Sequence, residues 1–301
     1  MLTKKSMEPK LTYFSIGDWG AIPTSINQVK YVANVMSNYS IFHKPRFVVS
    51  LGDNFYEDGV KNITDPKWDT SWYSMFIKPF PHLKHISWFS ILGNHDYDGG
   101  IKSVSSQIDM TNHCSNWVMP NNEYYTYDET SKSYHIFLDT IKIYPELYDN
   151  TKALYKHNKK VIHESLSYLE NRLIDARNRN SKWLFVYGHY HIFSNGYYGN
   201  YKSMIQRLYI LLKKYRVDVY FSGHEHNFQF MKFDGIYFCV NGGGAYKAEL
   251  AQQNSNHEVR TIYNSMNNGF LIHKIYDNFT HLQYVNSSNI VEFDYHIRVK
   301  E

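Results

Sequence analysis

Five short stretches of this 301-residue chain place oxygen and nitrogen donors of the kind that bind metal ions directly after apolar, strand-like runs. A glycine followed by Asp, Asn or His occurs by chance at many turns, so one such stretch alone would be a weak signal. Five of them in order along one chain predict a single dinuclear metal site. The stretches are Gly17-Asp18, Gly52-Asp53-Asn54-Phe55-Tyr56, Gly93-Asn94-His95-Asp96, Gly188-His189 and Gly223-His224-Glu225-His226.

A dinuclear site accounts for the different donor types. Two metal ions held about 3.5–4 Å apart need a ligand that bridges them, and a carboxylate, with two oxygens, suits that role. Asp53, central among the stretches, is the predicted bridge. The other donors divide into a harder, anionic set and a more neutral set. The first set is Asp18, Tyr56 and His226, and the second is Asn94, His189 and His224.

The donor stretches begin where predicted strands end, which is the edge at which open α/β sheets place their ligands. The glycines let the backbone turn sharply at that edge, so we expect the donors to converge. Apolar or alternating runs closed by polar clusters predict the strands. These runs are Leu11–Ile16, Phe47–Leu51, Ile86–Leu92, Tyr134–Leu138, Trp183–Tyr187 and Val217–Phe221.

Segments with the apolar spacing of helices lie between these strands. The first follows Ser25, a possible helix cap. Because strands and helices alternate, we predict a layered α/β domain. The helical positions are Ile26, Val29, Ala33 and Met36, then Val161, Ile162, Leu166, Leu169 and Leu173, and then Ile205, Leu208, Leu211 and Leu212.

The pattern changes beyond about residue 236, where strands follow one another without helices. Turn signals at Asp277-Asn278 and at Asn286-Ser287-Ser288-Asn289 separate them, which predicts antiparallel hairpins that close a second sheet. The basic run Lys152–Lys160 is interpreted as a solvated loop or the start of a helix. The predicted strands are Ile236–Val240, Gly269–Ile275, His281–Val285 and Val291–Val299.

Length and composition limit the function classes. With 43% hydrophobic residues the chain can bury a large core, and we expect one domain over residues 1–301 with a short tail at 1–10. Lys and Arg outnumber Asp and Glu by 32 to 28, which suits phosphate-bearing substrates but falls well short of a nucleic-acid signature. The two cysteines, Cys114 and Cys239, cannot make a disulfide framework.

The chain also shows no membrane or secretion signal. No run approaches the roughly 18 apolar residues needed to span a bilayer, and the first residues carry no apolar signal segment. As it stands, we therefore expect a cytoplasmic monomer with no membrane and no nucleic-acid partner.

The donor stretches, together with Ile136-Phe137-Leu138-Asp139-Thr140 and Asn241-Gly242-Gly243-Gly244, resemble the motifs of the purple acid phosphatases. The resemblance is to the small, tartrate-resistant type within the calcineurin-like metallophosphoesterases, and it covers nearly the whole chain from Leu11 onward. It implies a four-layer fold, with two mixed β-sheets packed as a central sandwich flanked by helices. It also implies secretion or a lysosomal location, which differs from the cytoplasmic expectation above.

The resemblance further implies the metals. Fe(III) would be bound by Asp18, Tyr56 and His226, and a divalent iron, zinc or manganese ion by Asn94, His189 and His224, with Asp53 between them. The wider superfamily usually has a His two positions after the first Asp, but here that position is Gly20 and Tyr56 appears instead. The Tyr56 phenolate on Fe(III) would give the purple colour.

This metal set predicts a hydrolase of phosphate monoesters. Metal binding can lower the pKa of water from 15.7 to about 7, and a trivalent ion should lower it further, so an acidic optimum follows. We expect hydroxide to attack phosphorus in line, with His95, adjacent to Asp96, protonating the leaving group or stabilising the transition state. After the match to Gly188-His189-Tyr190, mammalian-type relatives continue with Pro and later carry an acidic residue and a His near the substrate. An ungapped reading places His191, Tyr197 and Tyr198 at those three positions.

Two other functions use the same scaffold. A phosphodiesterase or nucleotide pyrophosphatase would share the two-metal core, and a non-catalytic scaffold could keep the phosphatase fold for protein binding. Loss of ligands would be expected in a scaffold, and none is missing here. The leading hypothesis is therefore an acid phosphatase, whose substrate is a small-molecule or protein phosphate ester and whose catalytic candidates are His95, Asp96, His191 and Tyr198.

Overall fold

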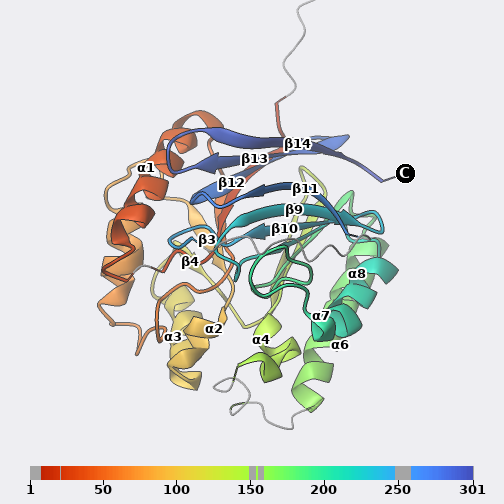
Figure 1. Ribbon diagram of the computed structural model, residues 1–301, viewed down its shortest axis with the longest axis horizontal. Helices are drawn as coiled ribbons and strands as arrows, with labels where there is room; N and C mark the ends of the chain where they lie inside the picture. The colour runs from red at the N-terminus through yellow and green to blue at the C-terminus, as the bar shows by residue number, and fades with distance from the viewer. Residues whose placement is uncertain (1–7, 21, 149–153, 155–158, 248–258, 301) are drawn as a thin grey trace, which may run out of the picture.

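Two seven-stranded sheets face each other in the computed structural model of this chain, which describes residues 8–20, 22–148, 154, 159–247 and 259–300 (Figure 1). The first sheet has the spatial order β14 (Val291–Arg298), β13 (Phe279–Asn286), β12 (Gly269–Ile275), β1 (Leu11–Ile16), β2 (Phe47–Ser50), β3 (Ser87–Ser90) and β4 (Trp117–Val118). The second has the order β11 (Arg260–Ser265), β9 (Phe228–Phe233), β10 (Ile236–Asn241), β8 (Val219–Ser222), β7 (Trp183–Tyr187), β6 (Ser133–Phe137) and β5 (Tyr124–Asp128).

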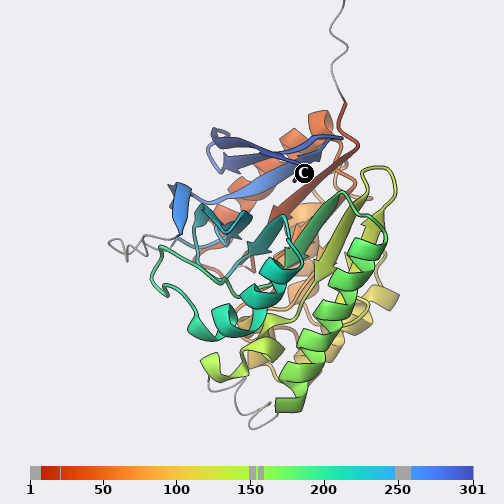
Figure 2. The ribbon, with the colours of Figure 1, turned by 90° about the vertical axis from the view of Figure 1, so that its right-hand side faces the viewer.

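Helices flank the two sheets. Helix α1 (Ile26–His43) contacts β12 and β13 of the first sheet, and α6 (Lys159–Asn178) lies along the second sheet against β6 (Figure 2). The shorter helices are α2 (Asn94–Asp98), α3 (Ile101–Asp109), α4 (Thr140–Ile143), α7 (Lys202–Met204) and α8 (Ile210–Lys214). Two π-helical segments, η1 (Trp68–Ile77) and η4 (Ile205–Tyr209), and two 3₁₀ segments, η2 (Met110–Asn112) and η3 (Pro145–Leu147), complete the set.

Each sheet contains a block of parallel strands. Strands β1 to β4 run parallel in the first sheet, and β6, β7, β8 and β10 run parallel in the second. Parallel strands covered on both faces are expected to be apolar throughout, and every residue of β1, β2, β7 and β8 is buried. The carboxyl ends of each block therefore form one edge, from which the donor stretches project.

Helix α1 shows why the local sequence forms this architecture. It begins directly after Ser25, as predicted, although the Ser25 side chain makes no cap hydrogen bond. Its buried face includes Val29, Val32, Ala33 and Met36, whose spacing of three to four residues matches one side of a helix. It ends at Lys44, whose left-handed backbone donates its N–H to the carbonyl of Ser40.

The strand predictions are largely confirmed, but the prediction that the last strands close a second sheet is wrong. Strands β12, β13 and β14 instead extend the first sheet, with β12 antiparallel to β1. Strand β10 joins the other sheet and runs parallel to β8. Turn residues specify which neighbours form a hairpin, but they carry no information on which distant strand the hairpin joins. Most of Lys152–Lys160 lies outside the described residues; its last two residues begin α6.

Polar aromatic groups are buried between the sheets. The His135 ring accepts or donates hydrogen bonds at both nitrogens, 2.9 Å from the Tyr187 hydroxyl and 2.8 Å from the Ser133 hydroxyl. Tyr13 bonds Tyr187 at 2.7 Å and stacks on His273 at 4.1 Å between ring centroids. Because burial disfavours the charged imidazole, the pKa of His135 falls from 6.5 to about 3.

No helix among the described residues is long and apolar enough to cross a membrane.

His135 predicts a defined loss of stability in acid. Its folded pKa lies below its unfolded pKa, so below about pH 6.5 the unfolded chain binds more protons, and stability falls as the pH drops toward 3. The contribution of one such group is at most about 1.4 kcal/mol per pH unit. His135→Gln should lower the free energy of unfolding at pH 7, because it disturbs the buried hydrogen bonds to Ser133 and Tyr187. Because Gln does not titrate, the substitution should also flatten the decline of this free energy between pH 6.5 and 4, measured by urea unfolding. Parallel pH curves for both proteins would contradict this account.

Candidate metal centre

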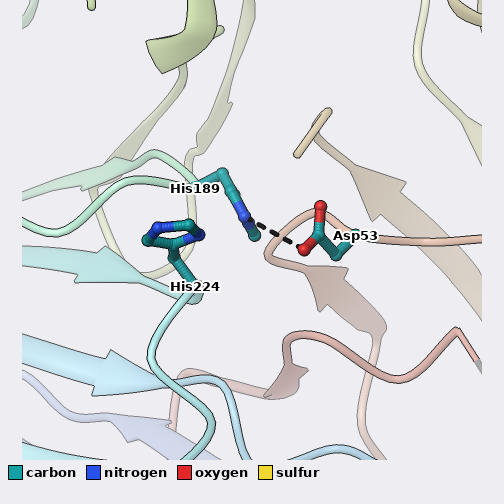
Figure 3. Close-up of side chains that lie close together, drawn as sticks. All are labelled: Asp53, His189 and His224. Atoms are coloured by element: carbon teal, nitrogen blue, oxygen red, sulfur yellow. Dashed lines mark ion pairs between the residues drawn. The ribbon is translucent and has the colours of Figure 1, made fainter. Parts of the chain in front are cut away.

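The donor stretches follow strands of both sheets and meet between them. Asp18 follows β1, Asp53 follows β2 and Asn94 begins α2 after β3, all from the first sheet. His189 follows β7, and His224 and His226 follow β8, from the second sheet. Figure 3 shows Asp53 facing His189 and His224 across the space between the sheets. All seven predicted ligands are therefore brought to one place.

Unusual backbone conformations turn the chain toward this place. Asp18, Asp53 and His224 have φ values of 56°, 52° and 72°, in the left-handed region that residues with a side chain seldom adopt. Strain of this kind persists only where the surrounding structure fixes it, and it is concentrated at functional sites. Three of the seven predicted ligands thus occupy strained positions.

Two glycines are required by close approach. Gly52 has φ 89°, and a Cβ there would lie 2.6 Å from Nδ1 of His189. At Gly93 a Cβ would lie 2.1 Å from Oδ1 of Asp53 and 2.4 Å from its backbone nitrogen. Any side chain at either position would displace a predicted ligand.

Tyr56 is the centre of the first half of the cluster. Its hydroxyl lies 3.0 Å from Oδ2 of Asp53, 3.2 Å from Oδ1 of Asp18 and 3.1 Å from Nε2 of His226. One phenolic proton cannot satisfy all of these acceptors. Burial, followed by the charges of Asp53 and Asp18, raises the pKa of Tyr56 well above its ordinary value.

His189 is the centre of the second half. Its Nδ1 donates to the carbonyl of Leu51 at 2.8 Å, so its Nε2 faces Oδ1 of Asn94 at 3.2 Å and Oδ2 of Asp53 at 3.4 Å. The ligand atoms of Asp53, His189 and His224 all lie within 4.8 Å of one another. Although burial lowers the pKa of His189, the charge of Asp53 raises it to about 9.

Asp53 joins the halves through one oxygen. Oδ2 faces both Tyr56 and His189, whereas Oδ1 accepts the backbone N–H of His95 at 2.9 Å. The sequence argument for a bridge invoked both carboxylate oxygens, but here a single oxygen faces both halves. Burial alone would raise the pKa of Asp53, yet the neighbouring His189 holds it well below its ordinary value. A cation in each half would relieve the crowding of lone pairs, so the donor set fits two metal ions.

A family model described as the calcineurin-like phosphoesterase matches residues 12–228. This chain belongs to that family. The curated relatives include the rabbit "Tartrate-resistant acid phosphatase type 5" (Oryctolagus cuniculus), 29% identical, which aligns over 79% of this chain and 74% of its own length. "Purple acid phosphatase 17" of Arabidopsis thaliana is also 29% identical, over 84% of this chain and 74% of its own length.

Solved structures show the same fold. One titled "GAP50 the anchor in the inner membrane complex of Plasmodium" aligns with a TM-score of 0.82 at 24% identity, over 97% of this chain and 89% of that one. The purple acid phosphatase PPD1 from yellow lupin seeds aligns with a TM-score of 0.69 at 18% identity, over 96% of this chain and 53% of that one. The expected mixed two-sheet phosphoesterase fold is confirmed.

A cavity of about 400 Å³ opens onto the centre of this phosphoesterase. It brings together parts of both predicted ligand sets, the predicted catalytic residues His95 and Tyr198, and two residues that the sequence argument missed, Asp98 and Tyr148. The lining residues are Asp53, Asn94, His95, Asp98, Tyr148, Tyr198, His224 and His226.

The carboxylate beside His95 is Asp98, not Asp96. Nδ1 of His95 lies 3.0 Å from Oδ2 of Asp98 and 2.9 Å from the carbonyl of Glu57. Although burial lowers the pKa of His95, the hydrogen bond that its Nδ1–H donates to the Asp98 carboxylate is the main cause that raises it to about 9. His95 and Asp98 are three residues apart on α2, a spacing that places side chains together once a helix is recognised.

Asp96 lies behind the ligands. It is fully buried and accepts the backbone N–H groups of Gly93 at 2.8 Å and Asn54 at 3.1 Å, and the side-chain amide of Gln107 at 2.9 Å. Burial and the nearby charge of Asp53 raise its pKa. It therefore fixes the turns that present Asp53 and Asn94, and it does not line the cavity.

Tyrosines surround His224. Nε2 of this ring lies 3.0 Å from the Tyr201 hydroxyl and 3.3 Å from the Tyr148 hydroxyl, while Tyr198 stacks on it at 4.6 Å between ring centroids. Because Nε2 is occupied by these hydroxyls, Nδ1 is the nitrogen that remains for a metal. Tyr148 and Tyr201 gave no sequence signal, because Tyr is abundant in this chain and neither residue lies in a donor stretch.

The other predicted residues of this loop occupy different positions. His191 is buried, donates from Nε2 to the carbonyl of Gly199 at 2.8 Å, and stacks on Tyr201. It does not line the cavity, and its position suits support of Tyr201 and His224. Tyr197 is 81% exposed. Glu225 holds the loop, because its Oε1 accepts the backbone N–H of Tyr198 at 2.8 Å.

Gly93→Ala should remove metal without unfolding the chain. The added methyl group would overlap Asp53, although the Gly93 backbone itself, at φ −108°, accommodates a side chain. At Gly100, whose φ is 74°, a Cβ meets nothing within 4 Å, so Gly100→Ala adds backbone strain without touching a ligand. We expect elemental analysis to show loss of most bound metal in Gly93→Ala and retention in the control Gly100→Ala. Equal metal content in the two proteins would contradict the geometry described for Asp53.

Proposed function

We propose that this chain is an acid phosphatase that hydrolyses phosphate monoesters at a dinuclear metal centre. The observation that carries the proposal is the convergence of the predicted ligands around Asp53. Its Oδ2 lies 3.0 Å from the Tyr56 hydroxyl and 3.4 Å from Nε2 of His189, and these two groups lie 3.2 Å from Asp18 and Asn94 in turn. The curated relatives aligned over about 80% of the chain are named tartrate-resistant or purple acid phosphatases, which supports the same activity.

Fe(III) is the proposed ion for the half formed by Asp18, Tyr56 and His226. The protein environment alone strongly disfavours ionisation of Tyr56, so a phenolate ligand requires a cation of high charge. Asn94, His189 and His224 provide neutral donors, which suit a divalent iron, zinc or manganese ion. Asp53, which faces both halves, would hold both ions.

Bound in these positions, the metal ions supply a nucleophile from water below neutral pH and polarise the phosphoryl oxygens. The protein contributes the alignment. The backbone N–H of His95 fixes the bridging carboxylate through Oδ1, and the backbone N–H of His224 donates to Oδ2 of Asp18 at 2.9 Å. These main-chain bonds keep the ligands in place during turnover.

His95 is the proposed proton donor to the leaving group. It lines the cavity, and its side chain is 32% exposed. Because Nδ1 is held by Asp98 and the Glu57 carbonyl, Nε2 is the nitrogen that can reach a leaving oxygen. Asp98 orients the ring and stabilises its protonated form.

Tyr148 and Tyr198 form the proposed wall for the leaving group. Both line the cavity on the side of His224, and Tyr198 remains 43% exposed. Aromatic walls contact planar groups over a large area. We therefore propose that the natural substrate is a small-molecule or protein phosphate ester with an aromatic group near the phosphate.

Tyr56→Phe tests the iron assignment. We expect the purified wild-type protein to show a visible absorption band from tyrosinate bound to Fe(III), and this band should disappear in Tyr56→Phe. Tyr246→Phe is the matched control, since Tyr246 packs 4.7 Å from the Tyr56 ring without being a predicted ligand. A wild-type protein without the band, or a band that survives in Tyr56→Phe, would remove the claim.

His95→Ala should separate proton donation from metal binding. General acid catalysis typically contributes 10²- to 10⁴-fold, so turnover of glycerol phosphate, whose alkoxide leaving group needs a proton, should fall within that range while metal content stays intact. Turnover of p-nitrophenyl phosphate should fall less, because p-nitrophenolate leaves without a proton. Asp98→Asn should lower turnover less and also preserve metal. Asp53→Ala should lose metal, and equal metal loss in His95→Ala would refute the separation. If bis-p-nitrophenyl phosphate were the better substrate, the chain would be a phosphodiesterase instead.

Tyr198→Ala tests the leaving-group wall. We expect kcat/KM to fall at least fivefold for phosphotyrosine and less than twofold for glycerol phosphate, because only the first leaving group has a ring to stack. Tyr197→Ala is the control, since that neighbouring side chain is exposed and does not line the cavity. An equal loss for both substrates would show that Tyr198 only supports His224.

A further inference from the structure

A second cavity, of about 560 Å³, lies at the opposite edge of the second sheet from the metal centre. The metal centre follows the carboxyl ends of β7 and β8, whereas this cavity lies beside Arg216, before β8, and Ile236, the first residue of β10. Helix α8 and the C-terminal end of β14 lie on the same side of the molecule in both ribbon views (Figures 1 and 2). The lining residues are Lys213, Arg216, Lys232, Asp234, Gly235, Ile236, Tyr237, His296, Ile297, Arg298, Val299 and Lys300.

The lining is strongly basic. It contains five cationic side chains, Lys213, Arg216, Lys232, Arg298 and Lys300, against one carboxylate, Asp234. This local surplus of four positive charges equals the formal net charge of the whole chain, +4. A neighbouring hollow of about 280 Å³ shares Arg216 and Lys300 and adds the cations Arg177 and Lys182 and the carboxylate Asp218. Cationic side chains thus outnumber carboxylates at this edge.

Several of these cations are held in place by the fold. Nζ of Lys300 donates to the carbonyls of Val217 at 2.6 Å and Arg216 at 3.0 Å, and it lies 3.5 Å from Oδ1 of Asp218. Lys213 pairs with Asp234 at 2.6 Å. Nζ of Lys232 lies over the Tyr237 ring, 4.8 Å from its centroid. Three of the five cations are therefore held in place before any ligand arrives, which reduces the entropy cost of binding.

Gathering like charges at one concave surface is unfavourable unless an anion balances them. Partial burial lowers the pKa of Lys300, because desolvation disfavours its charged form, and the neighbouring Asp218 opposes this shift. The volume lies within the 300–1,000 Å³ range of small-molecule sites, and a concave site suits a compact ligand better than a protein surface. Guanidinium groups bind phosphate in a bidentate way and ammonium groups bind it as point charges, so both cation types suit phosphate.

We propose that this cavity binds a small molecule carrying several phosphate groups, either free or as the headgroup of a lipid. The site is separate from the metal centre, since the two cavities share none of their lining residues. It does not depend on the proposed activity, because none of its lining residues belongs to the predicted metal or catalytic set.

Isothermal titration with myo-inositol hexakissulfate tests the proposal. A phosphatase does not hydrolyse this probe, and the substitutions of the test variant leave the residues of the metal centre unchanged, so a loss of binding belongs to the basic cavity. The test variant is Lys232→Gln with Arg298→Gln, and the matched control is Lys30→Gln with Lys102→Gln, two exposed lysines on α1 and α3. We expect the Kd of the test variant to rise at least tenfold and that of the control less than twofold, with kcat/KM unchanged in both.

Two results would overturn the proposal: no measurable binding by the wild-type chain, or equal losses in test and control variants, which would indicate non-specific attraction. Sedimentation with phosphatidylcholine vesicles containing phosphatidylinositol 4,5-bisphosphate distinguishes the sources. Vesicle binding that the test variant loses supports a lipid headgroup, and binding of the soluble probe without vesicle binding supports a free ligand.

Discussion

The rest of the structure depends on one constraint, the gathering of buried polar groups around Oδ2 of Asp53. The Tyr56 hydroxyl and Nε2 of His189 approach this oxygen from opposite halves, at 3.0 Å and 3.4 Å, and further ligands lie behind each of them. Buried polar groups are costly without partners. In the absence of metal these groups satisfy one another through a hydrogen bond and an ion pair, and the surrounding core must hold them at these positions.

The two sheets bring the ligands together, because each sheet presents its ligands from the ends of buried parallel strands. A single sheet edge could hold Asp18, Asp53 and Asn94, but His189 and His224 come from the other sheet, so closing the sandwich assembles the site. Main-chain bonds then fix individual side chains: Leu51 sets the His189 ring, and the N–H of His95 holds Asp53. Strained backbone at Asp18, Asp53 and His224 is tolerated because these contacts overdetermine it.

This dependence explains what the sequence could predict. Each donor stretch consists of neighbouring residues, a glycine and a ligand directly after an apolar run. The ligands and most strands could therefore be predicted from the sequence. The partners of the ligands are not local. Tyr201 meets His224 across 23 residues, and the pairing of β12 with β1 spans most of the chain, so neither leaves a pattern in the sequence. The pairing of Asp98 with His95 could have been predicted from their spacing of three residues, but only if the five-residue helix α2 had been expected.

The distribution of charge separates the two cavities in function. The described residues that line the metal-centre cavity include two carboxylates, Asp53 and Asp98, and neither Lys nor Arg. Protonated His95 is the cation that the protein itself contributes to this lining, so most of the attraction for a phosphate ester would come from the bound metal ions. The basic cavity has the opposite construction, because its positive charge belongs to the protein and persists whether or not metal is bound. Anion binding at one edge thus depends on metal loading, and at the other it depends only on the folded chain.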